Sequence, residues 1–233
     1  MQSSKTIGWL MIIGAVGVLI PYTILTAIFE YPGILRWETG IILTKFHEGG
    51  NRLIFTWLAF ALAGLPLLPA YILLGKSLEN QSGFARVATK MGTTGLIVQM
   101  IGLLRWVFVV PVLSDSFVAT SDPSLKTAAI MSFNTIHQFG GVLLGEHLGQ
   151  LFTVIWTLIM SINFIKWKIF PQWIGIFGVV SAVIYFLAQA ELLATVVRNM
   201  PVWEPAGFIG STLWLIWMTF IGVSIIRTKN INP

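Results

Sequence analysis

The sequence predicts an all-α membrane protein with six transmembrane helices. Of its 233 residues, 56% are hydrophobic and only 10% are charged, and the mean hydropathy is +0.84. Soluble domains carry about 25% charged residues, so this composition is typical of a chain embedded in a bilayer. Six apolar segments reach the length of about 20 residues that a span needs. The expected spans, within a single transmembrane domain over residues 1–233, are 6–29, 53–75, 91–113, 142–165, 172–195 and 207–226.

Proline positions refine these spans. Pro21, Pro66 and Pro69 fall inside apolar segments, where a missing N–H donor predicts kinks. Pro111 and Pro171 fall at segment ends and are expected to mark the limits of spans three and five.

Charged residues are distributed unequally between the two sides of the spans. One side carries both termini and the connections 76–90 and 166–171. Its charged residues are the basic Lys5, Lys76, Arg86, Lys90, Lys166, Lys168, Arg227 and Lys229 and the acidic Glu79. Basic residues accumulate on the cytoplasmic side, so both termini are expected to be cytoplasmic. The net charge of +5 then reflects orientation, and nucleic acid is not an expected partner.

The two long connections, 30–52 and 114–141, both lie on the expected outer side. In the first, apolar residues recur at helical spacing and Glu38 and Lys45 fall on the other face, which predicts an amphipathic helix lying in the membrane interface before span two. The apolar residues are Ile34, Leu35, Ile41, Ile42 and Phe46. The second opens with a polar, turn-rich stretch. It continues as a second interfacial helix, 125–139, that leads into span four.

Ionisable side chains near the outer ends of the spans are the main functional signal, because charge at membrane depth needs a partner or a role. Arg105 lies about 12 Å inside span three, at the helical rise per residue. In a structural interpretation, Arg105 pairs with Glu146 or Glu191, and Glu48 pairs with Arg52 at i,i+4. In a functional one, these groups line an outward-facing pocket. The expected pocket residues are Arg52, Arg105, Glu146, Gln150, Gln189, Glu191 and Arg198.

Three histidines, His47, His137 and His147, are candidate ligands for a divalent transition metal or for haem. No spacing is diagnostic, because His47 opens HEGGN and not the zinc signature HExxH. The chain has no cysteine, which excludes thiolate ligands and disulfides. A glycine series would admit a flat haem or pack helices closely, and packing is the favoured interpretation. The series is Gly140, Gly141, Gly145 and Gly149.

Two stretches carry a family resemblance. EYPGILRWETGIILTKFHEGGNRLIFTWLAFALAGLPLLPAYILLG (residues 30–75) and GLLRWVFVVPVL (residues 102–113) are similar to a family of bacterial multi-spanning membrane proteins catalogued only as a domain of unknown function. The resemblance implies a bacterial inner or plasma membrane location. It implies no activity, substrate or catalytic residue.

Three functions are consistent with these features. The first is a binding or sensing protein whose outward-facing pocket holds a small ligand, a metal or haem. The second is a membrane-embedded enzyme acting on a lipid or apolar substrate, with histidines and glutamates in acid–base or metal chemistry. The third is a non-catalytic subunit of a larger membrane complex, in which the polar network serves assembly.

Overall fold

The computed structural model describes residues 2–80 and 82–228, so Lys229 lies outside the described residues. Within them the chain is helical without strands, and six helical stretches are long and apolar enough to cross a membrane. The predicted fold class is confirmed, and the chain is a multi-pass membrane protein. The six stretches are Lys5–Phe29, Thr39–Leu78, Gly83–Ala119, Pro123–Lys166, Gln172–Ala194 and Ala206–Arg227.

Prolines bend the first two stretches. Helices α1 (Gln2–Gly17) and α2 (Leu19–Phe29) meet just before Pro21. Helices α3 (Thr39–Leu62) and α4 (Leu67–Leu78) meet at a turn that ends in Pro66. A proline cannot donate to the preceding turn and its ring crowds that turn, so the helix breaks on its N-terminal side. Pro69 lies in the first turn of α4, where backbone N–H groups have no intrahelical partner.

The third and fourth stretches are much longer than the predicted spans. Helix α5 (Gly83–Phe108) breaks at Val109 and continues as α6 (Val110–Ala119). Pro111 sits in the first turn of α6, where proline is tolerated, so it lies at the end of α5 but does not end the helical stretch. After a short turn, α7 (Pro123–Ile136), η2 (His137–Leu148) and α8 (Gly149–Lys166) follow without a break.

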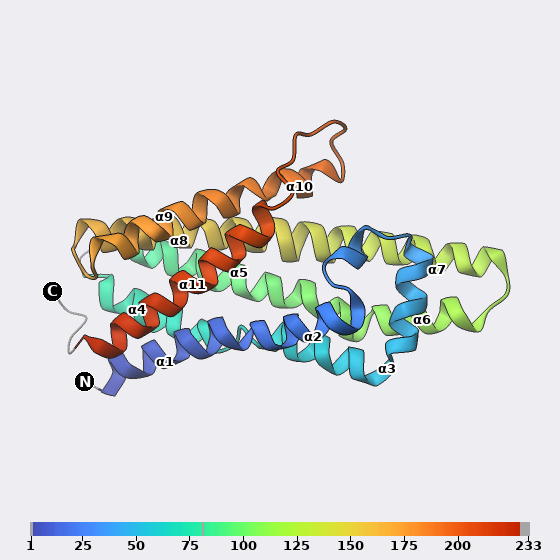
Figure 1. Cartoon of the computed structure of the whole chain (residues 1–233), viewed down its shortest axis with the longest axis horizontal. Helices are drawn as coiled ribbons and strands as arrows, with labels where there is room; N and C mark the ends of the chain where they lie inside the picture. Colours follow the sequence, from blue (N-terminus) through green and yellow to red (C-terminus); the bar gives the residue numbers. More distant parts are fainter. Residues whose placement is uncertain (1, 81, 229–233) are drawn as a thin grey trace.

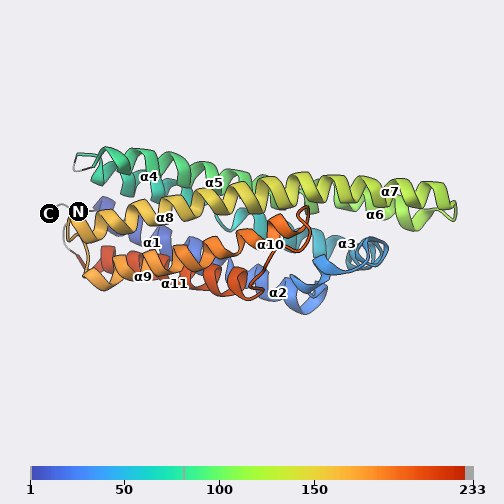
Figure 2. The ribbon, with the colours of Figure 1, turned by 90° about the horizontal axis from the view of Figure 1, so that it is seen from above.

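These lengths exceed what a bilayer requires. The stretches of 37 and 44 residues are about 55 and 66 Å long at the helical rise, or about twice the hydrocarbon thickness. Figure 2 shows the α6–α7 hairpin extending beyond the rest of the bundle, at the end opposite the termini. The segment 125–139 is thus helical as expected, but it is continuous with α8 and does not turn into the plane of the membrane.

The first half of α3 crosses the end of the bundle (Figure 1). Gly50 has a φ of 51°, which glycine tolerates, and the chain turns there from the crossing segment into the second span. Ile34 in the short helix η1 (Gly33–Arg36), Ile42 and Phe46 are each at most 2% exposed. Leu35 packs against the same core, whereas Ile41 is 45% exposed, so the predicted apolar face packs on the end of the bundle except at Ile41.

The last spans close the bundle. Helix α9 (Gln172–Leu187) is extended by the short α10 (Gln189–Ala194), and α11 (Ala206–Arg227) returns to the end where the chain began. Helix α11 packs against α1 and α9, and α8 packs against α5 and α9. Both termini lie at the same end of the molecule (Figure 1).

Two apolar cores fill the bundle. The core at the terminal end is built around Tyr71, Trp156 and Trp217. The core at the opposite end is built around Trp57 and Trp106, whose rings stack with centroids 4.7 Å apart. The buried polar side chains of the predicted pocket are Arg105, Gln150 and Gln189, and we call these residues with their contacts the polar layer.

Candidate functional site

Arg105, in the last turn of α5, is the most deeply buried charge of the polar layer and is 7% exposed. Its Nη1 donates to the carbonyl oxygen of Gly102 in the same helix. Its Nη2 lies 3.4 Å from Nδ1 of His137, and its guanidinium carbon lies 5.3 Å from the centroid of the Trp106 ring. Its Nε is buried and has no hydrogen-bond partner in the described part of the chain. The hydrogen bonds of Arg105 thus go to neutral groups.

The predicted glycine series makes room for this arginine. A Cβ placed on Gly141 would lie 2.5 Å from Nη2 of Arg105. A Cβ placed on Gly102 would lie 2.5 Å from Cα of Gly145 and 2.7 Å from the carbonyl oxygen of Gly140, so α5 and η2 are in backbone contact. The series therefore packs helices, which is the favoured interpretation of the sequence.

The segment that carries these glycines, η2, is a π-helix of 12 residues. π-Helical turns are rare and usually only one turn long, and they are frequent at functional sites. A π-helix has more residues per turn than an α-helix, so it changes which side chains share a face. His137, Gly141 and Gly145 face α5, while His147 lies on another side of the segment.

The carboxylates expected beside Arg105 form other contacts. Glu191 in α10 makes an ion pair with Arg36, and this contact raises the pKa of the Arg36 guanidinium. Glu146 interacts with Arg105 electrostatically but makes no ion pair or hydrogen bond with it among the described residues. Tyr31 faces the same pair, and burial raises the pKa of its hydroxyl. The structural interpretation in which Arg105 is locked by a carboxylate salt bridge is not what the structure shows.

Two other predicted pocket residues, Arg52 and Arg198, are exposed and do not join the polar layer. Glu48 and Arg52 make no ion pair in the described structure, because the positive φ of Gly50 interrupts the helix between them. Arg198 lies on the exposed loop after α10 rather than on a helix face shared with Glu191.

Gln150 and Gln189, two of the predicted pocket residues, contact each other in the polar layer. They are 6% and 5% exposed. Nε2 of Gln189 donates to Oε1 of Gln150, and Nε2 of Gln150 donates to the carbonyl oxygen of Tyr185 at 2.9 Å. This bridge ties α8 to α9 and α10.

The three histidines lie in three different environments. His137 stacks on Phe133, with ring centroids 5.4 Å apart, and contacts Arg105. His147 has a buried Nδ1 without a partner among the described residues. No group of three or more histidine, aspartate or glutamate side chains that could hold a metal ion is found in residues 2–80 and 82–228.

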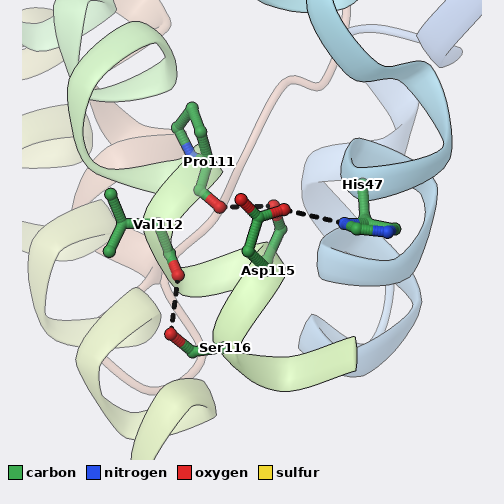
Figure 3. Close-up of polar contacts among 6 residues, drawn as sticks. His47, Pro111, Val112, Asp115 and Ser116 are labelled. Carbon is green, nitrogen blue, oxygen red and sulfur yellow. Dashed lines mark hydrogen bonds and ion pairs between the residues drawn. The ribbon is translucent and has the colours of Figure 1, made fainter. Parts of the chain in front are cut away.

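His47 on α3 pairs with Asp115 on α6, with Nδ1 2.8 Å from Oδ1 (Figure 3). Two serines flank this pair, but Oγ of Ser114 donates to the carbonyl oxygen of Pro111 and Oγ of Ser116 donates to that of Val112. The hydroxyl protons are therefore held by the helix backbone, and the arrangement joins the crossing helix to the hairpin.

A groove of about 710 Å³ runs between the α7–η2 segment and α10. This volume lies within the range of about 300–1,000 Å³ typical of small-molecule sites. One end carries the polar Asn134, Thr135 and Gln138, and His147 also lines the groove. The remaining walls are apolar and consist of Phe139, Val142, Leu143, Leu192, Leu193 and Val196.

Of the groove residues, the sequence singled out only His147. Gln138, together with Asn134 four residues earlier, would have been the available signal, since these two amides share one helix face just before an ionisable cluster. Their partner wall in α10 lies more than fifty residues further along the chain and has no polar pattern of its own.

The sequence was compared with known proteins. Residues 6–222 match a family described as a domain of unknown function, DUF4386. The chain belongs to this family. The matched range covers every residue of the polar layer and of the groove, and it ends within α11. No curated protein and no solved structure matches the chain.

Proposed function

We propose that this DUF4386 protein is a membrane-embedded binding protein that takes a small, mostly apolar ligand into the groove between α7–η2 and α10. The observation that carries the proposal is the groove itself: a volume suited to a small molecule, apolar walls, and polar side chains gathered at one end. Such a combination of apolar lining and a few polar groups is typical of ligand sites.

The surroundings of the groove support entry from the bilayer. Phe139, Leu143 and Val196 are 55%, 41% and 69% exposed, so the apolar walls continue onto the apolar outer surface of the molecule. A ligand dissolved among lipid chains would reach the groove by lateral movement. The groove lies in the half of the molecule away from the termini. By the charge distribution, this is the outer half of a protein in the cell membrane with both termini in the cytoplasm.

Binding is favoured over catalysis by the chemistry of the lining. Acid–base catalysis uses positioned groups that titrate near the working pH. The lining residues other than His147 are amides, one hydroxyl and apolar side chains. The groove lining offers a single histidine and no carboxylate or second histidine to ligate a metal or haem iron, so the proposed ligand is a metal-free organic molecule.

Photolabelling tests this proposal. The purified protein in nanodiscs is exposed to a 16-carbon alkyl probe that carries a diazirine near the chain end, and labelled peptides are mapped by mass spectrometry. We expect adducts on residues 134–147 and 189–197. Leu143→Trp, which fills the groove, should remove most of this labelling.

The matched control is Leu187→Trp on α9, which replaces a leucine of similar exposure, 46% against 41%, away from the groove. It should leave the labelling unchanged. Adducts spread evenly over all lipid-facing helices, unaffected by Leu143→Trp, would refute the proposed site.

A further inference from the structure

The polar end of the groove has a definite hydrogen-bonding pattern. Oδ1 of Asn134 accepts from Oγ1 of Thr39 at 2.7 Å, which leaves the Asn134 amide N–H groups as donors. Nε2 of Gln138 donates to Oγ1 of Thr195 at 2.9 Å, which leaves the Gln138 carbonyl oxygen as an acceptor. The Thr135 hydroxyl donates to the carbonyl oxygen of Met131 at 2.9 Å and can still accept.

The free donor of Asn134 and the free acceptor of Gln138 both belong to the polar part of the groove lining. Asn134 is hydrogen-bonded to Thr39 and Gln138 to Thr195, and both side chains line the same groove across the junction of α7 and η2. A single hydroxyl oxygen between them would accept from the Asn134 amide and donate to the Gln138 carbonyl.

Charged head groups fit this end less well. A carboxylate or phosphate only accepts, so it would face the Gln138 carbonyl and the Thr135 oxygen without a donor. The groove lining has no lysine, arginine, aspartate or glutamate to neutralise either sign of charge. Two carboxylates are adjacent in sequence to lining residues: Glu191 is paired with Arg36, and Glu146 interacts electrostatically with Arg105. Tertiary contacts also hold the orientation of the amides, through Thr39 from α3 and Thr195 from the segment after α10.

From this pattern we infer that the ligand is a neutral, single-chain amphiphile with a hydroxyl-bearing head group. The hydroxyl binds between Asn134 and Gln138, and the apolar chain lies along Phe139 and Leu143 toward His147. This inference rests on the proposed function and adds the chemical class and the direction of the bound molecule.

The test uses three photoactivatable probes with the same 16-carbon chain and diazirine, and with an alcohol, an ionised carboxylate or a trimethylammonium head. At equal membrane concentration we expect the alcohol to label residues 134–147 about fivefold more than either charged probe, the effect of about one net hydrogen bond. Equal labelling by all three at the groove would overturn the head-group assignment while leaving the groove as a binding site. No groove labelling by any probe would refute the proposed function itself.

Variants of Gln138 sharpen the result. Gln138→Met keeps the size of the side chain but removes the acceptor, and should abolish the preference for the alcohol. Gln138→Glu adds a negative charge at the same place and should transfer the preference to the trimethylammonium probe. Gln172→Met at the exposed start of α9 is the matched control and should behave as the parent protein. An unchanged alcohol preference in Gln138→Met protein that remains monodisperse would overturn the inference.

Discussion

Arg105 combines deep burial with hydrogen bonds to neutral groups, and the two features set its contribution to stability. A buried charge loses its hydration and recovers that free energy only when close ion pairs and hydrogen bonds replace the water. The guanidinium has hydrogen bonds to Gly102 and a contact with His137, while its Nε has no partner among the described residues. This residue is therefore not the lock of a salt-bridge network.

Replacement of Arg105 should reveal this balance. Arg105→Met keeps most of the volume without the charge, whereas Arg105→Lys keeps the charge and loses the planar hydrogen-bonding geometry. We expect the methionine variant to be more stable than the lysine variant by about 1 kcal/mol or more. Thermal unfolding in detergent, followed by tryptophan fluorescence, measures the difference. A methionine variant that unfolds well below the lysine variant would mean that the charge itself stabilises the fold.

The bridge between Gln150 and Gln189 gives a second prediction at this scale. Gln189→Leu should cost about 1–3 kcal/mol, because Oε1 of Gln150 then stays buried without its donor. Adding Gln150→Leu should recover at least about 1 kcal/mol of the summed single costs, since the two residues form one unit. Chemical unfolding of the four proteins in detergent micelles measures this coupling. Strict additivity would show that the bridge contributes no net stability.

Among the elements, the contact of α5 with η2 depends on glycine. Gly102→Ala places a Cβ against the backbone of Gly145 and Gly140, which cannot move aside as a flexible side chain would. We expect a loss of about 1–3 kcal/mol from overpacking. Gly83→Ala, at the start of the same helix with nothing within 4 Å of the added Cβ, is the control and should cost little. Equal stability of the two variants in thermal unfolding would contradict the close packing.

The sequence predicted the helices well because span length and hydropathy are local properties. It failed at the α6–α7 hairpin, where the polar, turn-rich start of the connection 114–141 indicated that the third span had ended; this start contains Ser114 and Ser116. In the structure their hydroxyls bond to backbone carbonyls within the helix, and Asp115 pairs with His47, so the polar residues continue the helix. Composition alone does not distinguish a polar loop from a polar helix that packs on a neighbour.

The site was predicted less completely, for a different physical reason. Arg105, Gln150 and Gln189 drew attention because polar groups in apolar segments are conspicuous, but none of them lines the groove. The groove was missed because its two walls, α7–η2 and α10, meet only in the folded bundle. The π-helix η2 also has more residues per turn than an α-helix. The spacing of an α-helix therefore assigns the later residues of η2, such as His147, to the wrong face.

The arrangement of the whole molecule allows a test of the membrane orientation that the charge distribution predicts. Both termini lie at one end, and the turn between α6 and α7 lies at the other (Figures 1 and 2). These two ends must therefore be on opposite sides of the membrane if the spans cross it. The positive-inside rule, applied to the basic residues at the terminal end, predicts that this end is cytoplasmic.

Because the chain has no cysteine, single cysteines can report this orientation without background. Ser124→Cys lies at the start of α7, and Asn80→Cys lies just after α4; both positions are exposed. A membrane-impermeant maleimide should label Ser124→Cys on intact spheroplasts and Asn80→Cys only after permeabilisation. The opposite result would invert the topology and would move the groove to the cytoplasmic half. Labelling of both positions on intact spheroplasts would mean that Asn80 and Ser124 do not lie on opposite sides, which is incompatible with α5–α6 crossing the membrane between them.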